Sequence, residues 1–79
     1  MSRLRPLHWK QVICVFKLAG FTFKKRSGTG TSHWIGEKPG VARPIVVPEY
    51  DEVGIDIIRS NMRTAAMSRE SFLELLARC

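Results

Sequence analysis

Apolar residues near the start of the chain recur at the spacing of an α-helix. Four of them share this spacing: Trp9, Val12, Ile13 and Phe16. The i, i+3, i+4, i+7 pattern predicts an amphipathic helix over residues 8–19. Gly20 ends this helix, because glycine readily adopts the left-handed conformation found just past a helix end.

Three short segments after this helix have the pattern of β-strands. In residues 21–26, aromatic positions alternate with polar and basic ones, so one face starts apolar and the other becomes basic. Residues 32–37 are the second predicted strand and residues 43–47 the third. Pro44 and Pro48 bound the third strand and favour a position at the edge of the sheet, because proline has no N–H to donate.

The C-terminal part of the chain returns to helical spacing. A helix is predicted over residues 53–65, and its apolar stripe consists of Ile55, Ile58 and Met62. Ser68 is the predicted N-cap of a last helix that runs to Arg78.

This element order, α-β-β-β-α-α, predicts one α+β domain over residues 1–79. The expected architecture has two layers, a three-stranded antiparallel sheet with the helices on one of its faces. The opposite face, which carries Thr22, Lys24 and Arg26, is expected to be open to solvent.

Basic residues outnumber acidic ones by 13 to 7, which gives a formal net charge of +6. This balance favours an anionic partner, whether nucleic acid, an anionic membrane or an acidic protein. No apolar run approaches the roughly 20 residues that span a bilayer, and no signal-type stretch follows the basic N-terminus. We therefore expect a cytoplasmic protein without a membrane-bound segment.

The two cysteines, Cys14 and Cys79, lie far apart in the chain without CxxC or Cys/His spacing. Their separation favours neither a disulfide framework nor a zinc site. Cys14 falls within the apolar pattern of the first helix and is expected to fill the core. Cys79 is expected to fray with the C-terminus.

A glycine-rich turn precedes the second strand and leads into His33. Residues 27–31 favour a hairpin turn, since they lack the Gly-Lys-Ser/Thr ending of a nucleotide-binding P-loop. Histidine exchanges a proton near neutral pH. The preceding strand carries Lys24, Lys25 and Arg26, which would attract a polyanion. This combination indicates a protein that binds RNA and cleaves it.

Several short motifs occur in a fixed order along most of the chain. They are Gly20-Phe21, the basic strand, Ser32-His33, Pro39-Gly40, Val46-Val47-Pro48, Gly54-Ile55 to Ala66, and Met67-Ser68-Arg69-Glu70-Ser71-Phe72-Leu73. In this combination the chain resembles the HicA-type (YcfA-like) mRNA interferase toxins of bacterial type II toxin–antitoxin modules.

The resemblance implies a fold similar to a double-stranded-RNA-binding domain (dsRBD-like) and a toxin that acts as a metal-independent mRNA endoribonuclease without a cofactor. The family's catalytic histidine follows a Gly-Ser pair and corresponds to His33. Ser32 and the basic residues Lys24, Lys25 and Arg26 are then expected to bind RNA. A HicB-type antitoxin is the expected inhibitor, and contact with DNA is expected only indirectly, through the antitoxin complex.

The chain departs from the family pattern at two places. Thr31 separates Gly30 from Ser32, and Tyr50 stands near the position where a second histidine often follows the third strand. The alternative function is a non-catalytic RNA-binding module of the same fold, which reads the shape of a duplex through phosphate and 2′-OH contacts. A DNA-binding helix-turn-helix over residues 54–77 is less favoured, because the acidic residues of its last helix suit a major groove poorly.

Two tryptophans and a second histidine have weaker functional signals. Trp34 suits stacking on an unpaired base, but strand alternation places it on the face opposite His33 and favours burial in the core. Trp9 is expected in the core or against the antitoxin. His8 precedes the first helix and is expected at the surface or as a helix cap.

Overall fold

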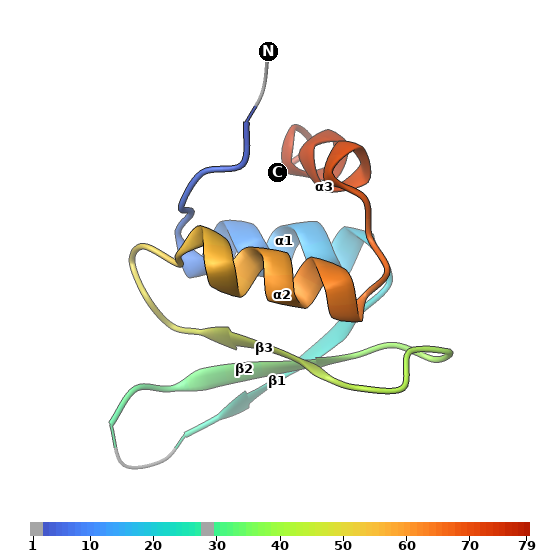
Figure 1. Cartoon of the computed structure of the whole chain (residues 1–79). Coiled ribbons are helices and arrows are strands. Elements are labelled where there is room, and N and C mark those ends of the chain that lie inside the picture. The colour runs from blue at the N-terminus through green and yellow to red at the C-terminus, as the bar shows by residue number, and fades with distance from the viewer. Residues whose placement is uncertain (1–2, 28–29) are drawn as a thin grey trace.

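The structure, a computed structural model, describes residues 3–27 and 30–79 of the chain. Its elements are α1 (Trp9–Leu18), β1 (Thr22–Arg26), β2 (His33–Glu37), β3 (Ile45–Pro48), α2 (Ile55–Thr64) and α3 (Arg69–Leu76) (Figure 1). The predicted order is confirmed, and each predicted end lies within two residues of the observed one. Gly28 and Thr29 of the predicted turn lie outside the described residues.

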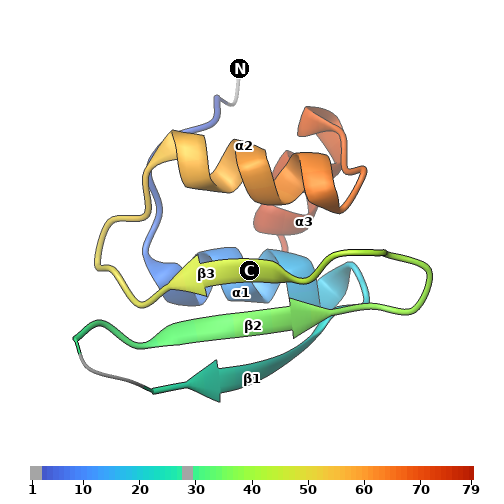
Figure 2. The ribbon, with the colours of Figure 1, turned by 60° about the horizontal axis from the view of Figure 1, so that its bottom comes forward.

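The three strands form one antiparallel sheet in the order β1-β2-β3 (Figure 2). β2 is therefore the central strand, with a hydrogen-bonded neighbour on each side. β3 lies at an edge, as Pro44 and Pro48 predicted. Because the pairing is in register along β2, the direction of each of its side chains is fixed by the two neighbouring strands.

All three helices lie on one side of the sheet (Figure 1). α1 and α2 contact the strands directly, whereas α3 packs on α1, away from the sheet. The predicted placement of helices on one face is confirmed, and within the described residues no helix covers the opposite face. In this part of the chain no helix has the length and apolar character needed to cross a membrane.

Three aromatic side chains pack together in the core, from α1, from α3 and from the residue just before β1. Phe16 of α1 and Phe72 of α3 have no exposed surface, and their rings meet at an angle with centroids 6.0 Å apart. Phe21, just before β1, meets Phe16 edge-on at 5.6 Å. Burying a phenylalanine side chain stabilises a fold by about 1.5–3 kcal/mol. Phe72 therefore holds α3 against α1.

Side-chain caps begin the first and last helices. His8 Nδ1 accepts a hydrogen bond from the Lys10 N–H (3.1 Å), and the His8 N–H donates to Gln11 Oε1 (3.4 Å). The two bonds together form a capping box. Of the two places expected for His8, the surface or a helix cap, the structure shows the cap. Ser68 Oγ accepts from the Ser71 N–H (3.1 Å), as predicted for the N-cap of α3.

At Gly36 of β2, side chains from both neighbouring strands lie close to the backbone. It pairs with Phe23 on one side and with Ile45 on the other. A Cβ at this position would lie 2.6 Å from the Phe23 ring and 2.9 Å from Ile45. Only glycine leaves room for both side chains to fill the core at this point.

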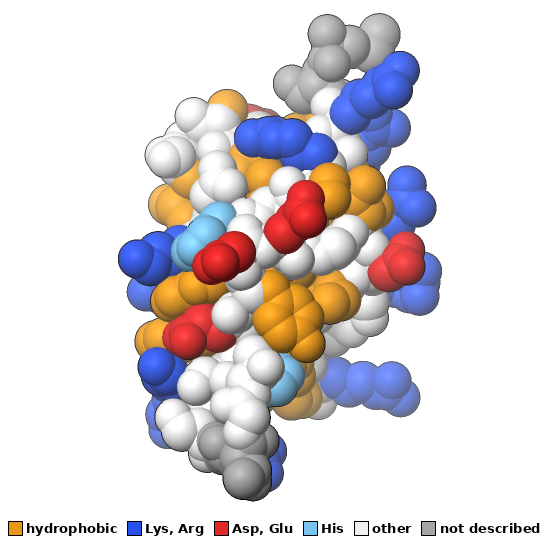
Figure 3. All heavy atoms as spheres, turned by 90° about the vertical axis from the view of Figure 1, so that its left-hand side faces the viewer, with side chains coloured by type: hydrophobic (Ala, Val, Ile, Leu, Met, Phe, Trp, Pro, Cys, Tyr) orange, Lys and Arg blue, Asp and Glu red, His pale blue; other side chains and the backbone are white. Residues whose placement is uncertain are grey.

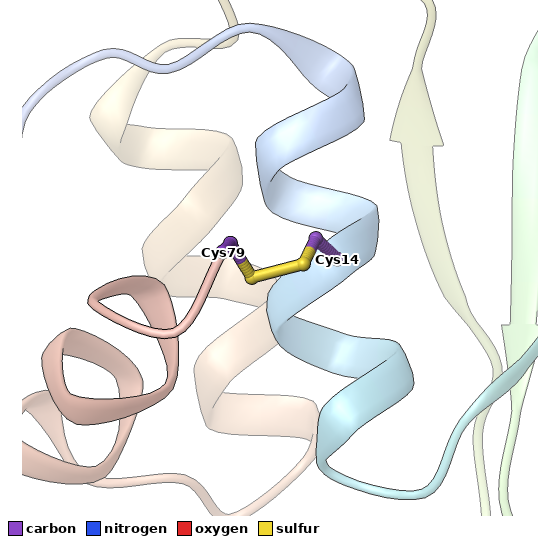
Figure 4. Close-up of a disulfide and its surroundings, with 2 residues drawn as sticks. All are labelled: Cys14 and Cys79. Atoms are coloured by element: carbon purple, nitrogen blue, oxygen red, sulfur yellow. A yellow bond between two sulfur atoms is a disulfide. The ribbon is translucent and has the colours of Figure 1, made fainter.

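The expectation for the cysteines is wrong. Cys14 and Cys79 form a disulfide that links α1 to the C-terminus (Figure 4). The two residues are 65 positions apart, yet the packing of α3 on α1 brings their Cα atoms to 6.1 Å. Spacing along the chain carries no sign of this pairing, because it arises from helix packing. Cys79 is therefore anchored rather than frayed.

Candidate nucleic-acid interface

His33 is the first residue of β2, the central strand of the sheet. It pairs with Arg26 of β1 and with Pro48 of β3, and its side chain is half-buried. Two neighbouring strands thus fix its backbone on both sides. A histidine placed on a strand in this way is held more firmly than one on a free loop.

Ser32 is tied down by a contact across the sheet. Its carbonyl accepts a hydrogen bond from the N–H of Glu49 (3.0 Å), which extends the pairing of β2 and β3 by one position. Ser32 is half-buried. The bond keeps the chain in place directly before His33.

The structure separates the three basic residues of β1 into two groups. Arg26 lies directly opposite His33, and Lys24 lies opposite Ile35, so these side chains share the open face of the sheet. Cross-strand partners of this kind have Cβ atoms about 4.5–5.5 Å apart. Lys24 and Arg26 are exposed. Lys25 pairs with Trp34 on the helix-covered face instead.

Lys25 joins a contact cluster with Trp34 and Glu49. The Trp34 indole N–H donates to Glu49 Oε1 (3.1 Å), and Lys25 Nζ lies 3.4 Å from the same oxygen. The Lys25 ammonium also lies over the Trp34 ring, 5.9 Å from its centroid. The hydrogen bond from Trp34, together with Lys25 and the charge of Lys10, lowers the pKa of Glu49 below its usual value, and partial burial opposes them. The carboxylate of Glu49 is thus held in its charged form.

The prediction that Trp34 lies on the face of the sheet opposite His33 is confirmed. Trp34 is half-buried there and stacks on another aromatic side chain. Trp34 stacks on Trp9 of α1 with ring centroids 5.5 Å apart and planes 16° apart. His8 stacks on Trp9 at 5.7 Å, and Lys10 lies over the Trp9 ring at 5.7 Å. No sequence signal pairs Trp9 with Trp34, because the contact depends on how α1 lies on the sheet.

The two histidines of the chain do not form a pair. His8 caps α1, and its Nε2 lies 3.6 Å from Asp51. Figure 3 shows both histidine side chains reaching one surface at separate places, with hydrophobic side chains between them. Tyr50, which stands near the position of the family's second histidine, is 42% exposed.

Within residues 3–27 and 30–79, no group of three or more His, Cys, Asp or Glu side chains is placed to hold a metal ion. What the open face offers is one histidine beside two exposed cations.

Comparison of the chain with protein-family models, with curated proteins and with solved structures finds no match in any of the three.

Proposed function

We propose that the chain is an RNA-binding endoribonuclease of the HicA type, the toxin of a toxin–antitoxin module. One observation carries the proposal. His33 is half-buried on the central strand, directly opposite the exposed Arg26 and on the same open face as Lys24. A proton-exchanging side chain beside cations on a solvent-facing sheet is an arrangement suited to a phosphodiester.

The reaction we propose uses the nucleophile that RNA carries. His33 accepts the proton of a ribose 2′-OH, and the 2′ oxygen forms a bond to the adjacent phosphorus. The bond from phosphorus to the 5′ oxygen breaks, and the leaving oxygen takes a proton from water. Arg26 and Lys24 stabilise the negative charge that develops on the phosphoryl oxygens. The products are a 2′,3′-cyclic phosphate end and a 5′-hydroxyl end.

The charge of the whole chain supports attraction of RNA. A formal net charge of +6 on 79 residues favours association with a polyanion. The uncovered sheet face leaves room for a large ligand beside His33.

An antitoxin of HicB type is the proposed inhibitor. Covering His33 and the exposed part of β1 is the simplest way to stop the reaction, and an acidic surface would complement Lys24 and Arg26. DNA would be reached only through that complex.

An mRNA substrate implies a cytoplasmic site of action, where thiols are generally kept reduced. The proposed toxin therefore has to act with Cys14 and Cys79 as thiols. Assaying RNA cleavage with and without reductant tests this point, and activity confined to the oxidised protein would contradict a cytoplasmic site of action.

Paired induction of the wild type and of His33→Ala tests the nuclease. We expect growth arrest and loss of RNA integrity with the wild type, and neither with His33→Ala, while RNA binding survives. His8→Asn is the matched control, since asparagine also caps helices and the variant removes the other histidine. An intact RNA pool under wild-type induction would overturn the proposal.

The alternative, a non-catalytic RNA-binding module, has one observation in its favour. His8, the other histidine, has Nδ1 engaged in capping α1 and Nε2 next to Asp51, so it is not placed to share acid–base work with His33. This alternative predicts that His33→Ala keeps full function while Lys24→Glu abolishes it.

A further inference from the structure

A groove runs along the exposed side of α1, on the helix-covered side of the sheet and away from His33. Its volume is about 550 Å³, within the range of small-molecule sites. Trp34 of β2 forms one wall, and the remaining lining residues belong to α1: Trp9, Lys10, Ile13, Cys14, Lys17 and Leu18. We call it the tryptophan groove.

The two indoles in the tryptophan groove are only partly covered. Trp9 and Trp34 are both half-buried, and Leu18, which also lines the groove, is 50% exposed. A centroid separation of 5.5 Å between planes only 16° apart means that the rings are offset. Each ring therefore leaves part of the other ring's surface uncovered. His8 and Lys10 also lie against the Trp9 ring, and Lys25 lies over the Trp34 ring, so a stacked base takes the place of an ammonium group.

Cations surround this aromatic pair. Lys10 and Lys17 lie on the α1 side, both exposed, and neither is ion-paired within the described part of the chain. Lys25 reaches the Trp34 ring from β1. The acidic group that faces them is Glu49, whose carboxylate is engaged by Trp34 and Lys25. Aromatic rings bordered by unpaired lysines are the arrangement that binds single-stranded nucleic acid, with bases stacked on the rings and phosphates near the cations.

We propose that the tryptophan groove holds an unpaired nucleobase of single-stranded RNA, stacked on Trp9 and Trp34, with Lys10 and Lys17 at its phosphates. This inference rests on the proposed function for the identity of the polymer, and it narrows the substrate class to single strands. A base inside a duplex is already stacked and paired, so it cannot enter the groove.

The position of the groove relative to His33 determines the path that a bound RNA strand would take. His33 and Trp34 are consecutive residues that project to opposite faces of the sheet. β1 forms one edge of the sheet, where the two faces meet. A single strand with one base in the groove and a phosphate at His33 would pass around this edge, along Lys25 on one face and Arg26 on the other.

Tryptophan fluorescence provides a direct test, because the chain has 2 tryptophans and both line the groove. The probe is an eight-nucleotide 2′-O-methyl RNA, which cannot be cleaved by attack of its 2′ oxygen. We expect it to quench the fluorescence, and we expect an abasic strand of equal length and a matched duplex to bind about tenfold more weakly without quenching. Equal binding and equal quenching by the abasic strand would overturn the proposal.

A charge reversal inside the groove and a matched one outside it distinguish binding in the groove from attraction by the general positive charge. Lys17→Glu should weaken binding of the octamer about tenfold. Arg59→Glu, the same reversal of charge at an exposed residue of α2, should have a much smaller effect. Trp9→Leu should weaken binding to a similar extent, with circular dichroism confirming that the variant is folded. Equal effects of the two charge reversals would contradict a specific site.

The outcomes also distinguish this proposal from the nuclease. Quenching by the octamer without cleavage of unmodified RNA would support the groove and reject the nuclease. Cleavage without quenching would reject the groove and leave the nuclease standing. If only a HicB-type protein perturbs the tryptophans, the groove is a protein-docking surface and our proposal is wrong.

Discussion

Replacing Cys79 with serine removes the covalent link between the C-terminus and α1. In the native chain this link closes a loop of 65 residues, most of the molecule. In the chain-entropy model, a closed loop of this length stabilises the folded state by about 4 kcal/mol, because the cross-linked unfolded chain has fewer conformations. We therefore expect Cys79→Ser to lower the free energy of unfolding by about 4 kcal/mol.

This loss is large for so small a domain. Typical stabilities per residue give a chain of this size roughly 4–12 kcal/mol in total. The folded structure itself should change little, since Phe72 keeps α3 packed on Phe16 without the disulfide. The effect should therefore lie in the unfolded state, which becomes more expanded.

Urea unfolding followed by circular dichroism measures both consequences. We expect a lower midpoint and a steeper dependence of the free energy on urea, because the open chain exposes more surface on unfolding. Reduced wild type should match Cys79→Ser, and adding reductant to the variant should change nothing. A difference below about 1 kcal/mol between oxidised and reduced wild type would refute the chain-entropy reasoning.

Three further changes test the sheet and the interface. Gly36→Ala places a Cβ 2.6 Å from a ring on β1, and overpacking of this kind costs about 1–3 kcal/mol, measurable as a lower thermal midpoint. The hydrogen bond from Trp34 and the charge of Lys25 lower the pKa of Glu49. The stability that Glu49 contributes is therefore present above the ordinary glutamate pKa of 4.5 and is lost as the pH falls through the lower pKa of the folded state. Melting curves from pH 6 down to pH 3 should show this loss in the wild type and not in Glu49→Gln. Arg26→Ala should reduce the slope of log binding constant against log salt by about 0.7 if this side chain contacts one phosphate of single-stranded RNA, and an unchanged slope would remove Arg26 from the interface.

Local patterns in the sequence were sufficient to predict the helices and strands and the face of the sheet to which each side chain of a strand points. The period of 3.6 in α1 and the N-cap at Ser68 depend on contacts within one turn of chain, so they can be read without a partner. The period of 2 in β2 is enough to place His33 and Trp34 on opposite faces of the sheet. The same alternation along β1 separates Lys25 from Lys24 and Arg26, yet sequence proximity grouped all three.

Long-range packing decided the rest. Nothing in the spacing of Cys14 and Cys79 indicates their bond, which exists because α3 lies on α1. The stacked pair of Trp9 and Trp34 depends in the same way on the placement of α1 over the sheet. The periodicity of hydrophobic residues predicts one element and its faces. Which two elements come into contact depends on how side chains from the whole core pack together. The sequence by itself therefore determined the helices, the strands and their faces, and only the tertiary structure decided which of those faces meet.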